Sequence, residues 1–164
     1  MASGDTLFIA TVQANEPPAS AFMTFDTRNA HLVLDADGAT DEECVFRGIM
    51  PSNYAGGGVT IKVHIMFTSA TTGTANVEIS WENMASQDAD ADGFATMTDG
   101  SVTPNATSGV ETILSVNFAN GAAMDSVVAG NEFRLKIRRD ADGTNGTDDI
   151  TTDMEIKSVE IVEQ

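Results

Sequence analysis

The segment Val59-Thr-Ile-Lys-Val-His-Ile-Met-Phe67 decides the fold of this chain, because its apolar residues recur at every second position. In an extended strand, successive side chains point to opposite faces of the sheet. One face of this segment is therefore apolar, and the other is mainly polar. Such alternation is typical of a half-buried β-strand.

The same period of two recurs along the chain and predicts about nine strands. These are Leu7–Gln13, Ala19–Phe25, His31–Leu34, Cys44–Ile49, Val59–Phe67, Ala75–Glu82, Val110–Phe118, Phe133–Ile137 and Met154–Val162. The apolar phase of the last strand slips at Ser158-Val159, which predicts a β-bulge. Only residues 122–128 favour a short helical turn, and residues 86–105 are predicted to form a long loop.

The strand pattern predicts an all-β fold, a jelly-roll-like antiparallel β-sandwich with long acidic loops. A chain of 164 residues is expected to form a single domain, 1–164, with residues 1–6 as an extended N-terminal arm. The inward-facing side chains are expected to form one continuous core. They are Val59, Ile61, Val63, Ile65, Val77, Ile79, Trp81, Leu114, Val116, Phe118, Phe133, Leu135 and Ile137.

Acidic residues dominate the charge, with 25 Asp and Glu against 8 Lys and Arg and a formal net charge of -17. Such a surface repels nucleic acid, so no nucleic-acid partner is expected. No apolar run reaches the roughly 20 residues of a membrane span, so no membrane partner is expected either. The N-terminus has no basic residue before a short apolar run, which predicts no secretory signal.

The motif Asp-Ala-Asp-Gly occurs three times, at 35–38, 90–93 and 140–143. In the second copy, Asp88, Asp90, Asp92 and Asp99 have the ligand spacing of a calcium loop, with Gly93 at the sixth position. The twelfth residue is Asp where Glu is usual, and neither flank is helical, so a solvated acidic turn is the preferred interpretation. Ca²⁺ at this loop is the only candidate cofactor. Looser versions of the pattern lie at 140–149 and 35–43.

Four of the eight cations lie together in the strand around Phe133: Arg134, Lys136, Arg138 and Arg139. Alternation places Arg134, Lys136 and Arg138 on one face. Two interpretations remain open. The stripe pairs with carboxylates across its own sheet, or it docks an acidic partner or another copy of the chain.

The remaining reactive residues indicate no catalytic centre. Cys44, the single cysteine, opens an apolar run and is expected to be buried. Trp81 is at an inward position and is expected in the core, whereas Tyr54, in a glycine-rich loop, is expected to be exposed and to contact a partner. His31 and His64 have no neighbouring ligand at zinc spacing. An enzyme is therefore not expected.

Two segments resemble jelly-roll virion proteins of tailed bacteriophages. They are Phe46-Arg-Gly-Ile-Met-Pro-Ser-Asn-Tyr-Ala-Gly-Gly-Gly58 and Ser126-Val-Val-Ala-Gly-Asn-Glu-Phe-Arg-Leu-Lys-Ile-Arg-Arg-Asp140. The resemblance extends from about Phe25 onward. It implies a non-enzymatic capsid decoration (cement) protein on the outside of a phage head, made in the host cytoplasm. The implied partners are the major capsid protein and copies of the chain itself, as a homotrimer. The alternative is a carbohydrate- or receptor-binding fibre or tail domain.

Overall fold

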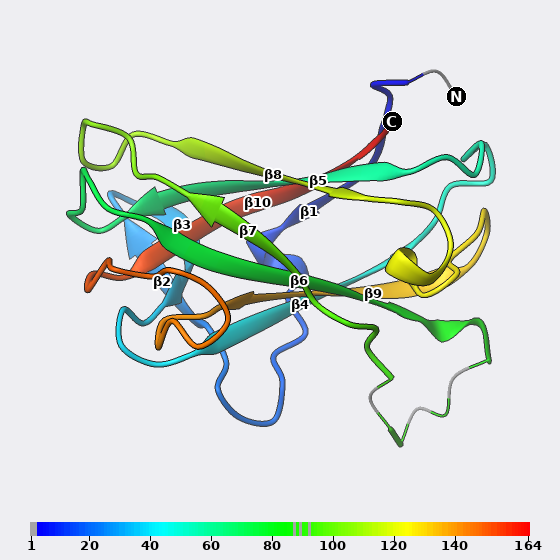
Figure 1. The fold of residues 1–164 in the computed structure, drawn as a ribbon, viewed down its shortest axis with the longest axis horizontal. Helices are drawn as coiled ribbons and strands as arrows, with labels where there is room; N and C mark the ends of the chain where they lie inside the picture. The colour runs from blue at the N-terminus through cyan, green and yellow to red at the C-terminus, as the bar shows by residue number, and fades with distance from the viewer. Residues whose placement is uncertain (1–2, 87, 89, 92) are drawn as a thin grey trace.

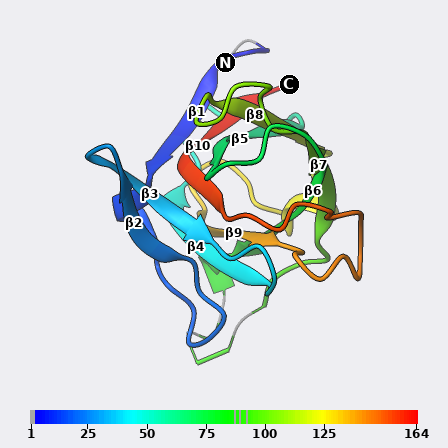
Figure 2. The ribbon, with the colours of Figure 1, turned by 90° about the vertical axis from the view of Figure 1, so that its left-hand side faces the viewer.

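The computed structural model describes residues 3–86, 88, 90–91 and 93–164, which form two antiparallel β-sheets packed face to face (Figure 1). The sheets lie on either side of one apolar core, as the end-on view shows (Figure 2). The predicted all-β sandwich is confirmed. No helix in the described part of the chain is both long and apolar enough to cross a membrane.

The larger sheet has six strands in the order β2-β3-β10-β5-β8, with β1 also paired to β10. Their bounds are β1 (Thr6–Thr11), β2 (Thr24–Arg28), β3 (His31–Ala36), β5 (Val59–Phe67), β8 (Thr112–Phe118) and β10 (Met154–Glu163). Strand β10 pairs with β5 along one edge, while its other edge pairs first with β3 and then with β1. A register shift between Ile156 and Ser158 confirms a bulge in β10 and makes Lys157 the extra residue.

The smaller sheet has four strands in the order β4-β9-β6-β7. Their bounds are β4 (Glu42–Ile49), β6 (Ala75–Asn83), β7 (Thr98–Val102) and β9 (Glu132–Arg139). Single 3-10 turns occur at η1 (Val12–Ala14), η2 (Met84–Ser86) and η3 (Ala122–Met124). The short turn predicted within 122–128 is therefore confirmed at η3.

The predicted core set is confirmed in full, because every one of those inward-facing side chains is buried in one cluster between the sheets. Trp81 lies at its centre and packs against Phe118 and Phe133, at ring-centroid distances of 6.1 Å and 5.1 Å. Such aromatic contacts contribute beyond the area that they bury. The apolar faces of the two sheets thus meet in a single core.

Two elements differ from the sequence prediction. The strand predicted at Ala19–Phe25 is wrong: Ala21 has a positive φ of 53°, and β2 begins only at Thr24. The segment before Thr24 instead follows the edge of β4, where Met23 N donates to Glu43 O at 3.0 Å. Strand β7 was not predicted, since it lies in the segment expected to be a long loop.

Candidate functional site

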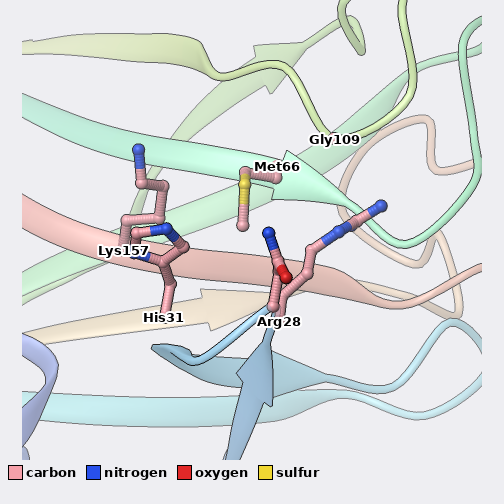
Figure 3. A pocket seen from close by; sticks show the side chains of 6 residues that line it. Arg28, His31, Met66, Gly109 and Lys157 are labelled. Atoms are coloured by element: carbon pink, nitrogen blue, oxygen red, sulfur yellow. The ribbon is translucent and has the colours of Figure 1, made fainter.

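A cavity of about 310 Å³ opens on the outer face of the larger sheet (Figure 3). Its lining residues come from four strands and two connecting segments: Arg28, Asn29, His31, Met66, Gly109 and Lys157. His31 and Met66 have the opposite phase to the core residues of β3 and β5, so the cavity lies outside the sandwich core. Its volume is at the small end of the range for ligand sites in proteins.

The β2–β3 turn builds one side of the cavity. Asn29 and Ala30 both have positive φ, 49° and 67°, which is the backbone of a two-residue hairpin turn matched to the strand twist. The turn makes Arg28 and His31 a directly opposed cross-strand pair. Their side chains therefore stand on the same face of the sheet.

The bulge in β10 supplies the opposite side. Lys157 has no partner in the register with β5, whereas Ser158 pairs with His64. A bulge re-aims the side chain of the extra residue, and here the Lys157 side chain stands beside the cavity (Figure 3). Met66, from β5, contributes the apolar surface between these two sides.

Arg28 forms a fixed wall of the cavity. Its Nη1 donates to Glu155 Oε2 at 2.5 Å and to Phe67 O at 2.8 Å, and its Nη2 donates to Thr68 O at 2.8 Å. Gly109, with φ of 76°, lies against this guanidinium, and a Cβ there would approach Arg28 Nη2 to 3.1 Å. Backbone carbonyls therefore position the guanidinium. Gly109 leaves room for it because it has no side chain.

Glu111 contacts two neighbouring basic side chains of this face. Its carboxylate accepts from Lys157 Nζ at 2.7 Å and contacts His64 Nδ1 at 3.0 Å. The Lys157 hydrogen bond, assisted by His64, holds the pKa of Glu111 below its ordinary value. Asn29 and His31, by contrast, form no side-chain hydrogen bond with any described residue, and both are exposed. These two side chains are thus available to a ligand.

Asp35, on the same outer face, carries a perturbed carboxyl group. Burial, together with the charges of Asp153, Glu155, Asp26 and Glu42, raises its pKa from 3.8 to about 6. Since the folded-state pKa lies above the unfolded-state value, ionisation of Asp35 opposes folding. Its contribution to stability therefore falls as pH rises from about 4 to about 6.

We expect the substitution Asp35→Asn to raise the melting temperature at pH 8 by about 2–4 °C, equivalent to about 1 kcal/mol after allowance for solvent screening. The gain should disappear below about pH 4, where the wild-type carboxyl is protonated in both states. Thermal unfolding followed by circular dichroism at pH 4 and pH 8 measures this difference. Asp88→Asn, which removes the same charge from an exposed turn, is the control; an equal gain in both variants would show a net-charge effect instead.

The cationic stripe of β9 pairs within its own sheet, which is the first of the two interpretations left open by the sequence. Arg134 Nη1 lies 2.7 Å from Glu82 Oε2, Lys136 Nζ lies 3.4 Å from Glu43 Oε2, and Arg138 Nε lies 2.5 Å from Glu78 Oε2. Phe94 also covers Lys136, whose Nζ is 4.3 Å from the ring centroid. The stripe is therefore largely neutralised by the chain itself.

Two residues of the predicted partner surface, Tyr54 and Arg139, are buried, and for Tyr54 the expectation of exposure is wrong. Arg139 points into the sandwich, where Asp148 binds its guanidinium at 2.9 Å and 3.1 Å and both side chains are inaccessible to solvent. Tyr54 is 6% exposed, and its hydroxyl donates to Gly57 O. The glycine loop folds back over the Tyr54 ring and so removes it from the surface.

The predicted calcium loop is only partly described. Asp92 lies outside the described residues, and Asp88 accepts a hydrogen bond from Asp90 N at 3.0 Å within the turn. Asp99 lies in β7, opposite Glu78, rather than in the loop. Among the described residues, Asp88, Asp90 and Asp99 do not form a group of converging carboxylates. Cation binding at this loop stays a prediction.

Cys44 and Trp81 both lie in the core, as expected, with no exposed surface. Burial raises the pKa of the Cys44 thiol far above its ordinary value, so the thiol is protonated and unreactive in the folded protein. Neither residue reaches the cavity of the larger sheet.

The chain can now be compared with known proteins. No protein-family model matches the chain, and no curated protein matches it. Several solved structures, however, do match the chain. The CBM22-2 xylan-binding domain of Paenibacillus barcinonensis Xyn10C matches with a TM-score of 0.56 and 16% identity, over 96% of this chain and 99% of that one.

Two further matches have the same character. The CBM35 module of Cellvibrio japonicus Abf62 has a TM-score of 0.52 and 10% identity, over 94% and 91% of the two chains. The xylan-binding module CBM15 has a TM-score of 0.51 and 12% identity, over 96% and 97%. The chain has the fold of a carbohydrate-binding module. These structures, matched along nearly their whole length, are non-catalytic modules.

The expectation that the chain is a phage decoration protein is therefore wrong. The whole-chain likeness found is to carbohydrate-binding modules of the CBM22, CBM35 and CBM15 types. The residues that resembled virion proteins have structural roles instead: Met50 is buried in the core, and Gly130, with φ of 83°, turns the chain before β9. Such features recur wherever a jelly-roll strand ends and do not mark a virion.

Proposed function

We propose that this chain is a non-catalytic module that binds a glycan through the cavity on the outer face of its larger sheet. One observation carries the proposal: the match to a xylan-binding domain spans 96% of this chain and 99% of the other. The likeness of fold therefore extends along nearly the whole of both chains. Xylan and its oligosaccharides are the first ligands to test.

The chemistry of the cavity suits a sugar. Carbohydrate hydroxyls both donate and accept hydrogen bonds, and the Asn29 amide and His31 imidazole offer both functions. Met66 offers a polarizable apolar surface for the C–H face of a sugar ring. Fixed polar groups around an apolar patch are the usual arrangement of a small-ligand site.

Binding without hydrolysis is favoured by the same lining. Hydrolysis of a glycosidic bond ordinarily needs two carboxyl groups flanking that bond. None of the described residues that line the cavity is Asp or Glu. The nearby carboxylates of Glu155 and Glu111 are engaged by Arg28 and by Lys157 and His64. The cavity therefore offers contacts for a sugar without a catalytic pair.

None of the described lining residues is Phe, Tyr or Trp, so we expect weak binding, with Kd on the order of 0.1–1 mM for a short oligosaccharide. The double variant Asn29→Gly, His31→Ala removes the two available side chains, and Gly keeps the positive φ of the turn. We expect it to lower the affinity for xylan at least about tenfold, which is the loss of about 1.4 kcal/mol.

Affinity gel electrophoresis on a polysaccharide panel, followed by calorimetry on the best ligand, measures this effect. Arg47→Gln is the matched control, because Arg47 is exposed on β4 of the opposite sheet. If the wild-type chain binds no polysaccharide of the panel, the proposed function is wrong. If it binds and the cavity variant binds equally well, the function stands but the ligand lies elsewhere.

A further inference from the structure

Three carboxylates from two separate loops converge at one end of the smaller sheet. Asp41 precedes β4, while Asp140 and Asp142 follow β9, and the register of these neighbouring strands pairs Glu42 with Arg139. One ligand oxygen from each of the three Asp residues lies within 4.8 Å of the others. Asp140 and Asp142 belong to the third Asp-Ala-Asp-Gly motif, and Asp41 follows the first.

The Asp140 carboxylate gives an independent indication of a ligand. Its side chain has no exposed surface, and Oδ2 accepts from Asn76 Nδ2 at 3.0 Å, Asn145 N at 3.0 Å and Gly146 N at 2.9 Å. Oδ1 is equally buried but has no hydrogen-bond partner among the described residues. A buried carboxylate oxygen without a partner is unfavourable unless a cation or donor satisfies it.

The carboxylates around this oxygen also favour a bound cation. Asp41, Asp140, Asp142 and Glu78 face one guanidinium, Arg138, which lies 3.8 Å from Asp41 Oδ2 and is bonded to Glu78. Thr144 N and Thr144 Oγ1 both donate to Asp142 Oδ1, at 2.9 Å and 2.5 Å. Four carboxylates against one cation leave the cluster strongly negative.

We propose that Asp41, Asp140 and Asp142 form a calcium-binding site that joins the β3–β4 turn to the β9–β10 loop. Ca²⁺ accepts six to eight oxygen ligands in flexible geometry, and backbone carbonyls or water complete such a shell. Mg²⁺ retains its water molecules more strongly and demands an octahedral arrangement. Three carboxylates from two loops, of which only Asp140 is fully buried, therefore suit Ca²⁺ better than Mg²⁺.

The site is expected to bind with Kd of about 0.1 mM, typical of modules with few charged ligands. At 10 mM CaCl₂ the melting temperature of the wild-type chain should then rise by about 5–10 °C. The same concentration of MgCl₂, at matched ionic strength, should give less than half of that rise. Matched ionic strength removes the general screening of the net charge of -17.

The variant Asp41→Asn, Asp142→Asn should lose the calcium-specific rise, because Asn retains the hydrogen bonds that these side chains accept but not their charge. Asp142→Asn alone, at an exposed position, serves if the double variant folds poorly and should lose most of the rise. The matched control Asp88→Asn, Asp90→Asn removes the same two charges from the other acidic turn and should keep the full rise.

Two results would overturn the site. One is an equal rise with CaCl₂ and MgCl₂, which would indicate screening alone. The other is a calcium-specific rise that survives in the Asp41, Asp142 variant or is lost only in the Asp88, Asp90 variant, since the cation would then bind elsewhere. Loss in the first variant and retention in the second supports the site.

Discussion

Replacing Arg139 by Met should lower the free energy of unfolding by about 3–5 kcal/mol, the usual consequence of breaking a fully buried ion pair from one side. The substitution leaves the Asp148 carboxylate buried with its charge unpaired. It also removes the donors that satisfy Thr152 O at 2.7 Å and Ile150 O. Arg139, at the end of β9, thereby fastens the loop that leads into β10.

Urea denaturation of the wild-type and variant chains measures this loss. Arg47→Met provides the control, because Arg47 is paired with Glu132 on the surface and its loss should leave the stability almost unchanged. Equal losses in the two variants would contradict the assignment of a special role to the buried pair. A loss confined to the Arg139 variant would show that the buried ion pair matters more than the surface pair of Arg47.

Replacing Trp81 by Ala should have a comparable effect, a loss of about 3–5 kcal/mol in the free energy of unfolding. The indole is fully buried between Phe118 and Phe133, so its removal leaves a cavity at the centre of the core. Trp81→Phe should cost much less, because the indole Nε1 has no hydrogen-bond partner to lose among the described residues. Circular dichroism is the suitable measurement, since Trp81 is the only tryptophan.

The Trp81→Phe variant also separates packing from ligand binding. If sugar binding uses the outer cavity, this variant should bind glycans as the wild-type chain does. A large loss of glycan affinity in a variant that remains folded would show that Trp81 contacts the ligand, against its position in the core. The experiment thus tests the expectation, made from strand phase alone, that Trp81 is a core residue.

Strand alternation predicted most of the fold but not β7. The segment Thr98-Asp-Gly-Ser-Val102 carries only one buried apolar residue, so it lacks the usual strand signal. Packing explains the composition: a Cβ on Gly100 would approach Val116 Cγ2 to 2.5 Å and Leu114 Cδ1 to 3.0 Å. Gly100 thus weakens the strand pattern in the sequence, and the same residue allows the facing sheet to approach.

The candidate site was less predictable, because its residues meet only through tertiary structure. The phase slip in the last strand signalled a bulge, yet nothing local indicated that the extra residue, Lys157, would face His31 and the β2–β3 turn. The prediction for Tyr54 was wrong, because this residue was expected at the surface and is buried. A glycine-rich loop predicted exposure, but those glycines allow the loop to close over the ring and bond its hydroxyl.

The resemblance to virion proteins misled on function for a related reason. The residues that carried it end strands, turn the chain or fill the core, so any jelly-roll domain has use for them. The segment from Asn131 to Arg139 is an example, since its apolar face fills the core and its cations neutralise carboxylates of the same sheet. A pattern of this kind reports architecture, whereas the binding site proposed here lies on the outer face of the larger sheet.

Cys44 makes the opening of the sandwich directly measurable. It is the only thiol in the chain and has no exposed surface between the two sheets, so a thiol reagent reaches it only when the sheets separate. In the limit of fast closing, its labelling rate without denaturant reports the equilibrium population of open molecules. Labelling the same sulfur in the presence and absence of a cation or a glycan would then show how far each ligand holds the two sheets together.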